Sequence, residues 1–486
     1  MSGWNDIRAG VAGSRATLLE SLERPDEKQL QRLQQIVERN RNTEFGKRYG
    51  LQNVRTIDDF QQRVPLHDYD DFRPDIERMM AGEKNVLVAD DVLLFEPTGG
   101  STGGSKFIPY TEASLSAVRR AILPWLDDLV TSRPGITKGK AYWAISPATR
   151  QKTHTSGGIP IGIEDDSAYF GRDLAPSIVD TLAVPPTVAA IQSLDEWRSQ
   201  TLSYLSTCTD LSFISVWSPT FLLQLLDASP DPVEWQKRWP MLDTISCWCS
   251  STSQRYAAEL ARRFPNARIQ EKGLLATEGV VTVPLDAAAA PVLAVDSGFY
   301  EFETDSGDVV LPWDLETGQT YRVLITTDAG LYRYRLGDRV RVSDWYEATP
   351  CLEFMGRDGG GSDLCGEKLT EAFVAAALND VPGFAFLVPL TKPHPAYLLI
   401  LDEAVVGSRQ ARVAAEVTDD KLMKNPQYRY AREIGQLPPI EARRIGEPLS
   451  TYKDICMRLG QRLGDIKAPA LANTAWSEQF IESSEP

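Results

Sequence analysis

Apolar residues recur at helical spacing in two stretches of the chain. In residues 15–40, leucine, isoleucine and valine follow near-helical spacing on both sides of Pro25, so we expect helical structure that is broken near this proline. In a second stretch, apolar residues lie three or four positions apart, at Leu115, Val118, Ile122, Leu126 and Leu129. This spacing predicts a helix with one buried face, which opens at about Thr111, a residue type that caps helices.

Alternation with a period of two, which is typical of strands, is clearest around a turn at Asp328-Ala329-Gly330. Residues 321–326 alternate on one side of this turn and residues 331–336 on the other. The pattern predicts an antiparallel hairpin whose second strand ends at Gly337-Asp338.

Two glycine-rich runs interrupt the predicted elements. The first follows a short apolar strand expected at residues 92–98 and is expected to lead directly into the helix at Thr111. The second is Arg357–Ser362, with three consecutive glycines, and we place a domain boundary there. About 130 residues remain for a smaller α+β domain at the C-terminal end.

The composition mainly limits the kinds of partner that the protein is expected to bind. The chain has 486 residues, 42% of them hydrophobic, and its 51 basic against 67 acidic residues give a formal charge of −16. A net acidic surface argues against binding to nucleic acid or to an anionic membrane. The first residues lack the apolar segment of a signal peptide, and no run of 18 apolar residues occurs, so neither secretion nor a membrane span is expected.

Cysteine and histidine are both sparse. The six cysteines are irregularly spaced, and we interpret them as reduced thiols of a cytoplasmic protein. His67, His154 and His394 are far apart in sequence, which argues against catalysis or metal binding that depends on a positioned imidazole.

The strongest local signal for chemistry is the run from Thr98 to Lys106, Thr-Gly-Gly-Ser-Thr-Gly-Gly-Ser-Lys. Four glycines let the backbone approach a ligand closely, while hydroxyls, backbone N–H groups and the lysine offer partners to phosphate oxygens. The spacing fits neither a Walker A loop nor a dinucleotide fingerprint. A flexible linker is the alternative, but the position between an apolar strand and an amphipathic helix favours phosphate binding.

Two further patterns are weaker on their own. Thr277-Glu278 reads either as a helix cap or solvated loop, or as a contact to Mg²⁺ or phosphate. Gly330-Leu-Tyr-Arg-Tyr-Arg-Leu-Gly-Asp338 reads either as a solvated hairpin face or as a hairpin whose terminal aspartate accepts hydrogen bonds from a diol such as ribose.

Together the three patterns resemble the motifs of the adenylate-forming superfamily of luciferases, acyl-CoA synthetases and adenylation domains. Within it, the chain is similar to the Gretchen Hagen family of acyl acid amido synthetases, and residues 330–338 are the most specific match. Smaller matches extend the resemblance from about residue 90 to the C-terminus. The resemblance implies an α/β fold with a large N-terminal adenylation domain, residues 1–354, and a small mobile α+β domain, residues 355–486.

The resemblance also implies a reaction in two steps, in which a carboxylic acid and ATP give acyl-AMP and pyrophosphate, and an amine then takes the acyl group. It assigns the ATP phosphates to Thr98, Gly100, Ser101, Thr102 and Lys106. Thr277 is expected at the α-phosphate and Glu278 at Mg²⁺, Asp338 at the ribose hydroxyls and Phe354 beside the nucleoside. Lys368 and Lys467 are expected to enter from the small domain and to neutralise phosphate charge.

Two positions depart from the superfamily pattern. Gly99 replaces a hydroxyl residue of the phosphate loop, and Leu274 stands where a tyrosine usually stacks on adenine. Neither change removes a charge, so we expect adenylation to survive. Apolar walls for the acid are expected from Val118, Trp125, Trp217, Phe221 and Trp248, although each of these side chains also suits an ordinary core.

Two other functions remain open on the sequence alone. An acyl-CoA ligase shares the first step, but the chain has Gly-Arg-Asp-Gly-Gly-Gly from Gly356 in place of the usual hinge sequence of those enzymes. A nucleotide-binding regulator without turnover is the second alternative. We expect ATP, Mg²⁺, a small acid and an amine or amino acid as ligands, and a monomer or weak dimer.

Overall fold

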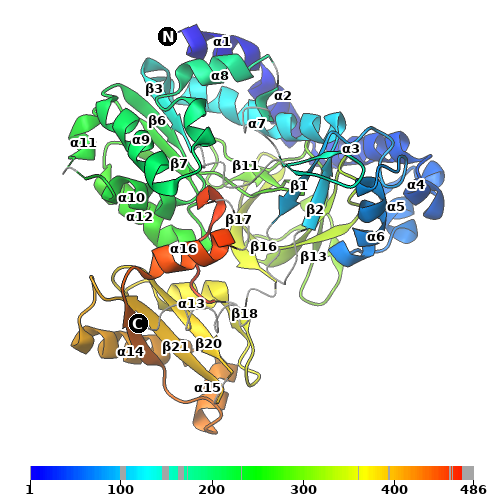
Figure 1. Cartoon of the computed structure of the whole chain (residues 1–486). Helices are drawn as coiled ribbons and strands as arrows, with labels where there is room; N and C mark the ends of the chain where they lie inside the picture. Colours follow the sequence, from blue (N-terminus) through cyan, green and yellow to red (C-terminus); the bar gives the residue numbers. More distant parts are fainter. Residues whose placement is uncertain are drawn as a thin grey trace. The chain divides into compact units, whose positions relative to one another are not determined.

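The computed structural model describes residues 2–98, 106–144, 153–162, 169–171, 173–230, 233–358, 361–391, 394–458, 461 and 463–472. They form two compact units (Figure 1). The larger unit contains residues 1–217, 223–248 and 260–354, and the smaller contains residues 355–486 with two short segments, 218–222 and 249–259. No helix of the described residues is long and apolar enough to cross a membrane.

Helices form the first part of the larger unit: α1 (Ser2–Val11), α2 (Ser14–Leu22), α3 (Pro25–Asn40), α4 (Glu44–Arg48), α5 (Ile57–Arg63) and α6 (Tyr69–Met80). The predicted break near Pro25 is confirmed, because this proline starts α3. Proline suits the first turn of a helix, where its missing N–H would have no partner. Leu18, Leu33 and Ile36 are buried, so the apolar positions face the core as expected.

A four-stranded sheet carries the glycine-rich run, in the order β2 (Lys106–Tyr110), β1 (Leu94–Thr98), β5 (Pro160–Ile161) and β4 (Thr153–His154). The expected direct passage from loop to helix is wrong, since β2 lies between them and pairs antiparallel with β1. The helix follows as α7 (Glu112–Ser132), and Thr111 caps it as predicted, with its hydroxyl accepting from the Ser114 N–H.

The predicted hairpin lies in a seven-stranded sheet, where β15 (Thr320–Thr326) pairs antiparallel with β16 (Tyr334–Tyr346). The expected end at Gly337-Asp338 is wrong, because β16 continues to Tyr346 and Asp338 lies within it. Gly337 has a φ of 82° and lies inside the strand. The glycine therefore does not end the strand, although it predicted a break in the sequence. The remaining strands are β11 (Thr282–Val283), β12 (Val292–Leu293), β13 (Phe299–Glu303), β14 (Val309–Val310) and β17 (Thr349–Arg357).

A parallel sheet completes the larger unit, in the order β3 (Lys140–Trp143), β6 (Leu211–Ser215), β7 (Thr244–Cys247) and β8 (Arg268–Glu271). It is followed by a short hairpin, β9 (Leu275–Ala276) and β10 (Gly279–Val280). The helices between these strands are α8 (Ala175–Thr181), α9 (Leu194–Thr207), α10 (Pro219–Asp227), α11 (Trp235–Arg238) and α12 (Gln254–Arg263).

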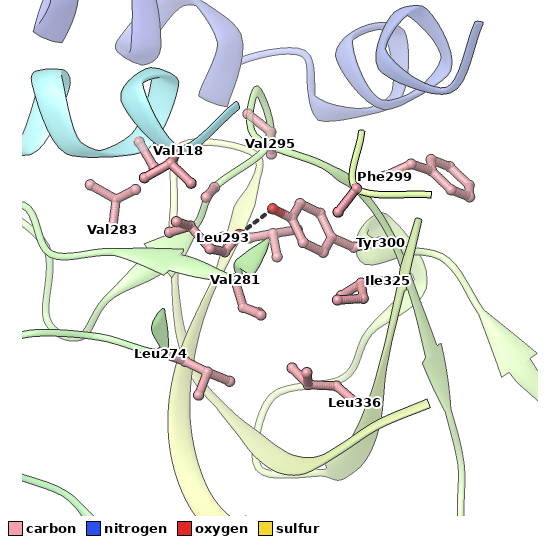
Figure 2. Close-up of a cluster of buried hydrophobic side chains, with 14 of the residues drawn as sticks. Val118, Leu274, Val281, Val283, Leu293, Val295, Phe299, Tyr300, Ile325 and Leu336 are labelled. Atoms are coloured by element: carbon pink, nitrogen blue, oxygen red, sulfur yellow. Dashed lines mark hydrogen bonds between the residues drawn. The ribbon is translucent and has the colours of Figure 1, made fainter. Parts of the chain in front are cut away.

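A large hydrophobic core joins the N-terminal helices, α7 and the seven-stranded sheet. Figure 2 shows part of it, where Val118 of α7 and Leu274 lie among side chains of the seven-stranded sheet, including Phe299, Tyr300 and Ile325. The Tyr300 hydroxyl donates to the Val280 carbonyl, so the polar end of this buried ring is satisfied. The core therefore ties α7 and the β9–β10 hairpin to the same sheet.

The smaller unit has its own core around a three-stranded sheet, β20 (Ala385–Leu390), β21 (Ala396–Asp402) and β22 (Glu441–Ile445). The pair β20–β21 is antiparallel and β21–β22 is parallel. A short pair, β18 (Gly361–Ser362) and β19 (Leu369–Thr370), and four helices complete it: α13 (Glu371–Ala377), α14 (Ser408–Leu422), α15 (Pro426–Glu433) and α16 (Pro448–Arg458). This mixture of sheets confirms the α/β fold class.

Candidate active site

The two ends of the glycine-rich loop lie side by side on paired strands. Thr98 and Lys106 are partners in the β1–β2 register, while Gly100, Ser101 and Thr102 lie outside the described residues. The Lys106 ammonium donates to the Tyr334 hydroxyl at 3.2 Å, and lies 5.4 Å from the centre of the Tyr69 ring. Lys106 is therefore positioned by aromatic groups, one of which belongs to the 330–338 segment.

Thr277 and Glu278 form the two-residue turn between β9 and β10. Neither of the ordinary alternatives, a helix cap or a solvated loop, describes this turn, since the Glu278 carboxylate is only 3% exposed. The hydroxyl of Tyr110, the last residue of β2, donates to the Thr277 carbonyl at 2.9 Å. Burial raises the pKa of Tyr110 well above its usual range, so its phenol stays a hydrogen-bond donor.

A small cavity opens beside this turn. Val118 and Ser114 of α7 line it together with Glu278 and Thr327. The Thr327 hydroxyl is buried and has no hydrogen-bond partner among the described residues. The Glu278 carboxylate can bind a metal ion that carries a phosphate. The nearby Thr327 hydroxyl can donate a hydrogen bond to that phosphate or to a carboxylate.

The 330–338 segment is not a solvated hairpin face, because all of its residues except Arg335 and Gly337 are buried. Arg333 donates from Nε and Nη2 to the Glu301 carboxylate at 2.9–3.2 Å, and from Nη1 to the carbonyls of Gln61 and Val64. Its φ of 47° is left-handed, which costs about 1–2 kcal/mol for a residue with a side chain. The five hydrogen bonds hold the backbone in that conformation.

Gly330 is required where this segment turns. Its φ is 80°, and a Cβ atom built there would lie 2.8 Å from the Cβ of Leu87. Any larger residue would push the turn away from Leu87 and would strain the backbone as well. The turn and the Arg333 network thus fix the start of β16, which carries both Tyr334 and Asp338.

Asp338 and Phe354, the two residues expected at the nucleoside, lie on strands β16 and β17 of the seven-stranded sheet. Asp338 is 4% exposed, and Phe354 is partly buried against the main core. The sheet places Asp338 four residues after Tyr334, the tyrosine that contacts Lys106.

Three of the five predicted wall residues come together around a lysine that sequence reasoning missed. The Lys272 ammonium lies 5.5 Å from the ring centre of Trp125 and 4.8 Å from that of Trp217. The rings of Trp217 and Trp248 are 6.0 Å apart. The signal in the sequence was a charged residue five positions before Thr277, directly after a strand.

The other two wall residues lie elsewhere. Val118 borders the cavity at Glu278, on the same helix as Trp125. Phe221 is buried in the segment 218–222, which groups with the smaller unit. Its place in the acid pocket stays a prediction.

Lys368 and Lys467 belong to the smaller unit, and both are exposed. Lys368 follows Glu367, a buried carboxylate that accepts from the N–H groups of Leu364 and Cys365 at 2.7 Å each. The φ of Lys368 is 47°, which lies in the left-handed region. The backbone around Lys368 is therefore held in a specific conformation while its side chain reaches solvent.

The segment that carries Lys467 is fixed to the edge of β20. The Leu387 N–H donates to the Ala470 carbonyl at 2.8 Å, and the Ala472 N–H donates back to the Leu387 carbonyl at 2.8 Å. Burial raises the pKa of Glu371, although the Ala470 N–H and the charge of Lys467 both act to lower it. Lys467 is thus an exposed cation in a loop that is anchored to β20 three residues later, at Ala470.

Metal-binding clusters are a further test of the site. The described residues contain no group of three histidine, cysteine, aspartate or glutamate side chains that could hold a metal ion. All six cysteines are described, and all are free thiols. Glu278 is the acidic side chain in the Thr277-Glu278 turn, and a single such carboxylate suits an ion that takes most of its ligands from a nucleotide and water.

Comparison with known proteins places this architecture in a family. The GH3 family N-terminal domain matches residues 15–234, and the GH3 family central domain matches residues 291–357. The match begins well before residue 90, so the predicted extent of the resemblance was too short at the N-terminal side.

Individual relatives are distant in sequence but long in overlap. An indole-3-acetic acid-amido synthetase of Arabidopsis thaliana is 23% identical, over 73% of this chain and 71% of the relative. A jasmonoyl–L-amino acid synthetase of Oryza sativa is also 23% identical, over 92% of both chains.

Solved structures share the fold. The GH3.15 acyl acid amido synthetase superposes with a TM-score of 0.82 at 17% identity, over 97% of this chain and 96% of that one. A 2-hydroxyisobutyryl-CoA ligase in its postadenylation state superposes with a TM-score of 0.61 at 12% identity, over 94% and 92% of the chains. The family domains cover well over half of the sequence, and the chain therefore belongs to the GH3 family.

Proposed function

We propose that this protein is an ATP-dependent amide synthetase. A carboxylic acid attacks the α-phosphorus of ATP, which gives acyl-AMP and releases pyrophosphate. An amine then attacks the acyl carbon, which gives the amide and AMP, and the amine loses one proton. The observation that carries the proposal is the match of both GH3 domains, in a fold where the three motif segments reach the same unit.

The residues of the larger unit have separate roles in this proposal. Thr98, Lys106 and the loop between them bind the ATP phosphates, with Lys106 directed by Tyr334 and Tyr69. Thr277 contacts the α-phosphate. Asp338 accepts hydrogen bonds from the ribose, and Phe354 packs beside the nucleoside. Fixed charges and dipoles of this kind stabilise the charge that develops in the transition state without a covalent intermediate on the protein.

Mg²⁺ is the metal that the proposal requires. When bound, it neutralises phosphate charge, and Glu278 supplies the protein oxygen. The burial of this carboxylate in a cavity with the Thr327 hydroxyl supports that role. Lys368 and Lys467 supply further positive charge from the smaller unit, which acts as the mobile domain.

The substrates are a small carboxylic acid and an amino acid. Relatives named indole-3-acetic acid-amido and jasmonoyl–amino acid synthetases support this class, as does the indole-rich wall around Lys272. Six free thiols support a cytoplasmic protein, and a monomer or weak dimer stays our expectation.

The first experiment measures pyrophosphate release from ATP with a panel of aromatic and aliphatic acids, followed by mass spectrometry of products formed with amino acids or with CoA. We expect acid-dependent pyrophosphate release and an amide product. A Glu278→Gln variant, which keeps the shape of the side chain, should lose at least about a hundredfold in rate.

The outcomes separate the three functions. A thioester in place of an amide would make the protein an acyl-CoA ligase. ATP binding with no acid-dependent pyrophosphate release would make it a nucleotide-binding regulator, and either result would overturn the proposal.

A further inference from the structure

A second cavity lies in the larger unit, on the other side of α7 from the Glu278 turn. Helices α2, α3 and α7 supply all of its lining except Asp296 (Figure 1), and its volume is about 530 Å³. Val118 of α7 lines the cavity at Glu278, whereas Ser116 and Arg120, two positions before and after it, line the second cavity. Residues two positions apart on a helix point about 200° apart, so the two cavities are separate sites.

Basic side chains dominate the lining of the second cavity. The charged residues of the lining are Lys28, Arg32, Arg119, Arg120 and one acidic residue, Asp296. The chain as a whole has 16 more acidic than basic residues, so this lining runs against its composition. Such a local reversal of charge concentrates a positive potential in the cavity and favours an anionic ligand.

The buried carboxylate of Asp328 is shared among several of the arginines. Arg32 and Arg120 both form ion pairs with Asp328, the second at 3.5 Å. Arg39 donates to the same carboxylate at 2.7 Å. One negative charge thus meets three guanidinium groups and cannot neutralise all of them. The Arg120 Nε donates at 2.7 Å to the Asp296 carbonyl, which supplies a hydrogen bond but no charge.

Burial weakens Asp296 as a further counter-charge. It raises the pKa of the Asp296 carboxyl, although the Ser21 hydroxyl and the charge of Lys28 act to lower it. Burial also lowers the pKa of Arg32 to about 9, and the charge of Arg120 acts in the same direction. The lining therefore holds basic groups whose charged form is destabilised, and a bound anion would stabilise that form.

Hydrogen-bond donors accompany the charge. The Arg119 Nη1 donates to the Glu112 carboxylate at 2.7 Å, while its Nε is buried and has no hydrogen-bond partner in the part of the chain that the structure describes. Buried donors are nearly always satisfied by protein, water or ligand. Lys28 and Arg120 add N–H groups to the lining, and Ser116 adds a hydroxyl. Several donors around one positive site suit a phosphate group, whose oxygens accept from several directions.

We propose that the second cavity is an anion site that binds a phosphate group through Lys28, Arg32 and Arg120. The ligand is inorganic phosphate or a small phosphate ester, and its charge supplements the single carboxylate that three arginines share. This site is additional to the proposed function, in which the ATP phosphates bind between Thr98 and Lys106. Neither of those two residues lines the second cavity.

Calorimetry of the full-length protein with inorganic phosphate and with glycerol 3-phosphate tests the proposal. Lys106→Met removes the cation of the glycine-rich loop, so phosphate binding that persists in this variant belongs to the second cavity. We expect about one such phosphate per chain, with an affinity that falls as the salt concentration rises. Tighter binding of glycerol 3-phosphate identifies an ester as the ligand, and equal or weaker binding identifies free phosphate.

Ser116 offers a matched pair of variants that leaves every arginine in place. Ser116→Asp puts a carboxylate into the lining and should weaken phosphate binding at least about tenfold, while raising the thermal midpoint of the phosphate-free protein. Ser116→Asn has nearly the same shape without the charge and should have much smaller effects on both. Lys28→Met should also weaken phosphate binding about tenfold, whereas Lys47→Met, at an exposed position of α4 outside the cavity, should not.

Three results would overturn the proposal. In the first, the intact protein binds no phosphate. In the second, Lys106→Met abolishes the binding and the Lys28 and Ser116 variants leave it unchanged. In the third, Ser116→Asp and Ser116→Asn weaken binding equally, so that charge plays no part. None of these measurements involves turnover, so the anion site and the proposed amide synthesis stand or fall separately.

Discussion

Arg333 and Lys272 are two buried cations in the same unit with different kinds of partner. Arg333 donates to a buried carboxylate and to two backbone carbonyls, so the protein itself supplies charge and geometry. Lys272 donates to a hydroxyl and lies against two indole faces. The first environment holds a backbone segment in place, while the second joins a helix and two loops through a hydroxyl and two indole rings. Burial of a charge therefore indicates function only once its partners are known.

The largest effect is expected from Arg333→Met. This change leaves Glu301 buried without its arginine and removes support from the left-handed backbone at position 333, so the free energy of unfolding should fall by about 3–5 kcal/mol. Denaturant titration followed by tryptophan fluorescence measures it. Arg335→Met is the control, because Arg335 is 36% exposed and its pair with Glu303 should contribute less than about 1 kcal/mol. If both variants lost the same free energy of unfolding, the buried Arg333 pair would be no more important for stability than the exposed Arg335 pair, and the prediction would be wrong.

Lys467→Ala tests an exposed cation of the smaller unit. Its side chain is exposed, so the free energy of unfolding should change little, but adenylation should slow by about a hundredfold if the ammonium contacts charge that develops in the transition state. The second step, started from synthetic acyl-AMP and amine, should be affected less. Comparing the two half-reactions measures this directly, and equal slowing of both would contradict the role.

Asp338→Ala probes a buried anion on the strand that begins next to Arg333. A charge-assisted hydrogen bond contributes about 1.5–3 kcal/mol, so ATP binding should weaken about ten- to a hundredfold. Calorimetry with ATP and with the acid alone measures the two ligands separately. Unchanged ATP affinity, or an equal loss for the acid, would remove Asp338 from the ribose site.

His67 gives the smallest effect, a dependence on pH. Its Nδ1 lies 3.0 Å from the Tyr332 carbonyl, its Nε2 lies 3.2 Å from the Tyr49 hydroxyl, and its backbone pairs with the Arg333 segment. Burial lowers the pKa of His67 below its unfolded value near 6.5, although the Tyr332 carbonyl opposes this.

The direction of the pH effect follows from that shift. Above about pH 6.5 the imidazole is neutral in both states and its contribution is complete; as pH falls, the unfolded chain takes up the proton first and stability declines. Denaturant titrations of the wild type and His67→Gln between pH 5 and 8 should differ in slope. Parallel curves would contradict this assignment.

The sequence predicted correctly those features of the fold that depend on residues close together in the chain. The cap at Thr111 and the apolar spacing of α7 depend on residues three or four positions apart; the cap is confirmed, while the helix is buried on every side from Pro124 to Val130 rather than on one face. Strand β2 was missed because it is short, contains Pro109 and exists only through its pairing with β1. The extension of β16 beyond Asp338 likewise depends on neighbouring strands.

The candidate site shows the same division. Motifs located the loop ends, the Glu278 turn and the Tyr334 segment, because each is a short run of unusual residues. Lys272 was not located, since its environment depends on Ser215, Trp125 and Trp217, which lie 55 to 147 residues away along the chain. Tyr69, which positions Lys106, is hidden for the same reason.

The attachment of the C-terminal segment to β20 has a consequence for digestion by proteases. The two hydrogen bonds that fix it involve Ala470 and Ala472, only a few residues beyond Lys467. Trimming that stops after Ala472 leaves the lysine on its anchored loop, whereas cleavage before Ala470 keeps the lysine in the chain but frees its backbone. A nick at that point would therefore produce a protein of nearly full mass in which Lys467, the lysine proposed to act in adenylation, is no longer anchored to β20.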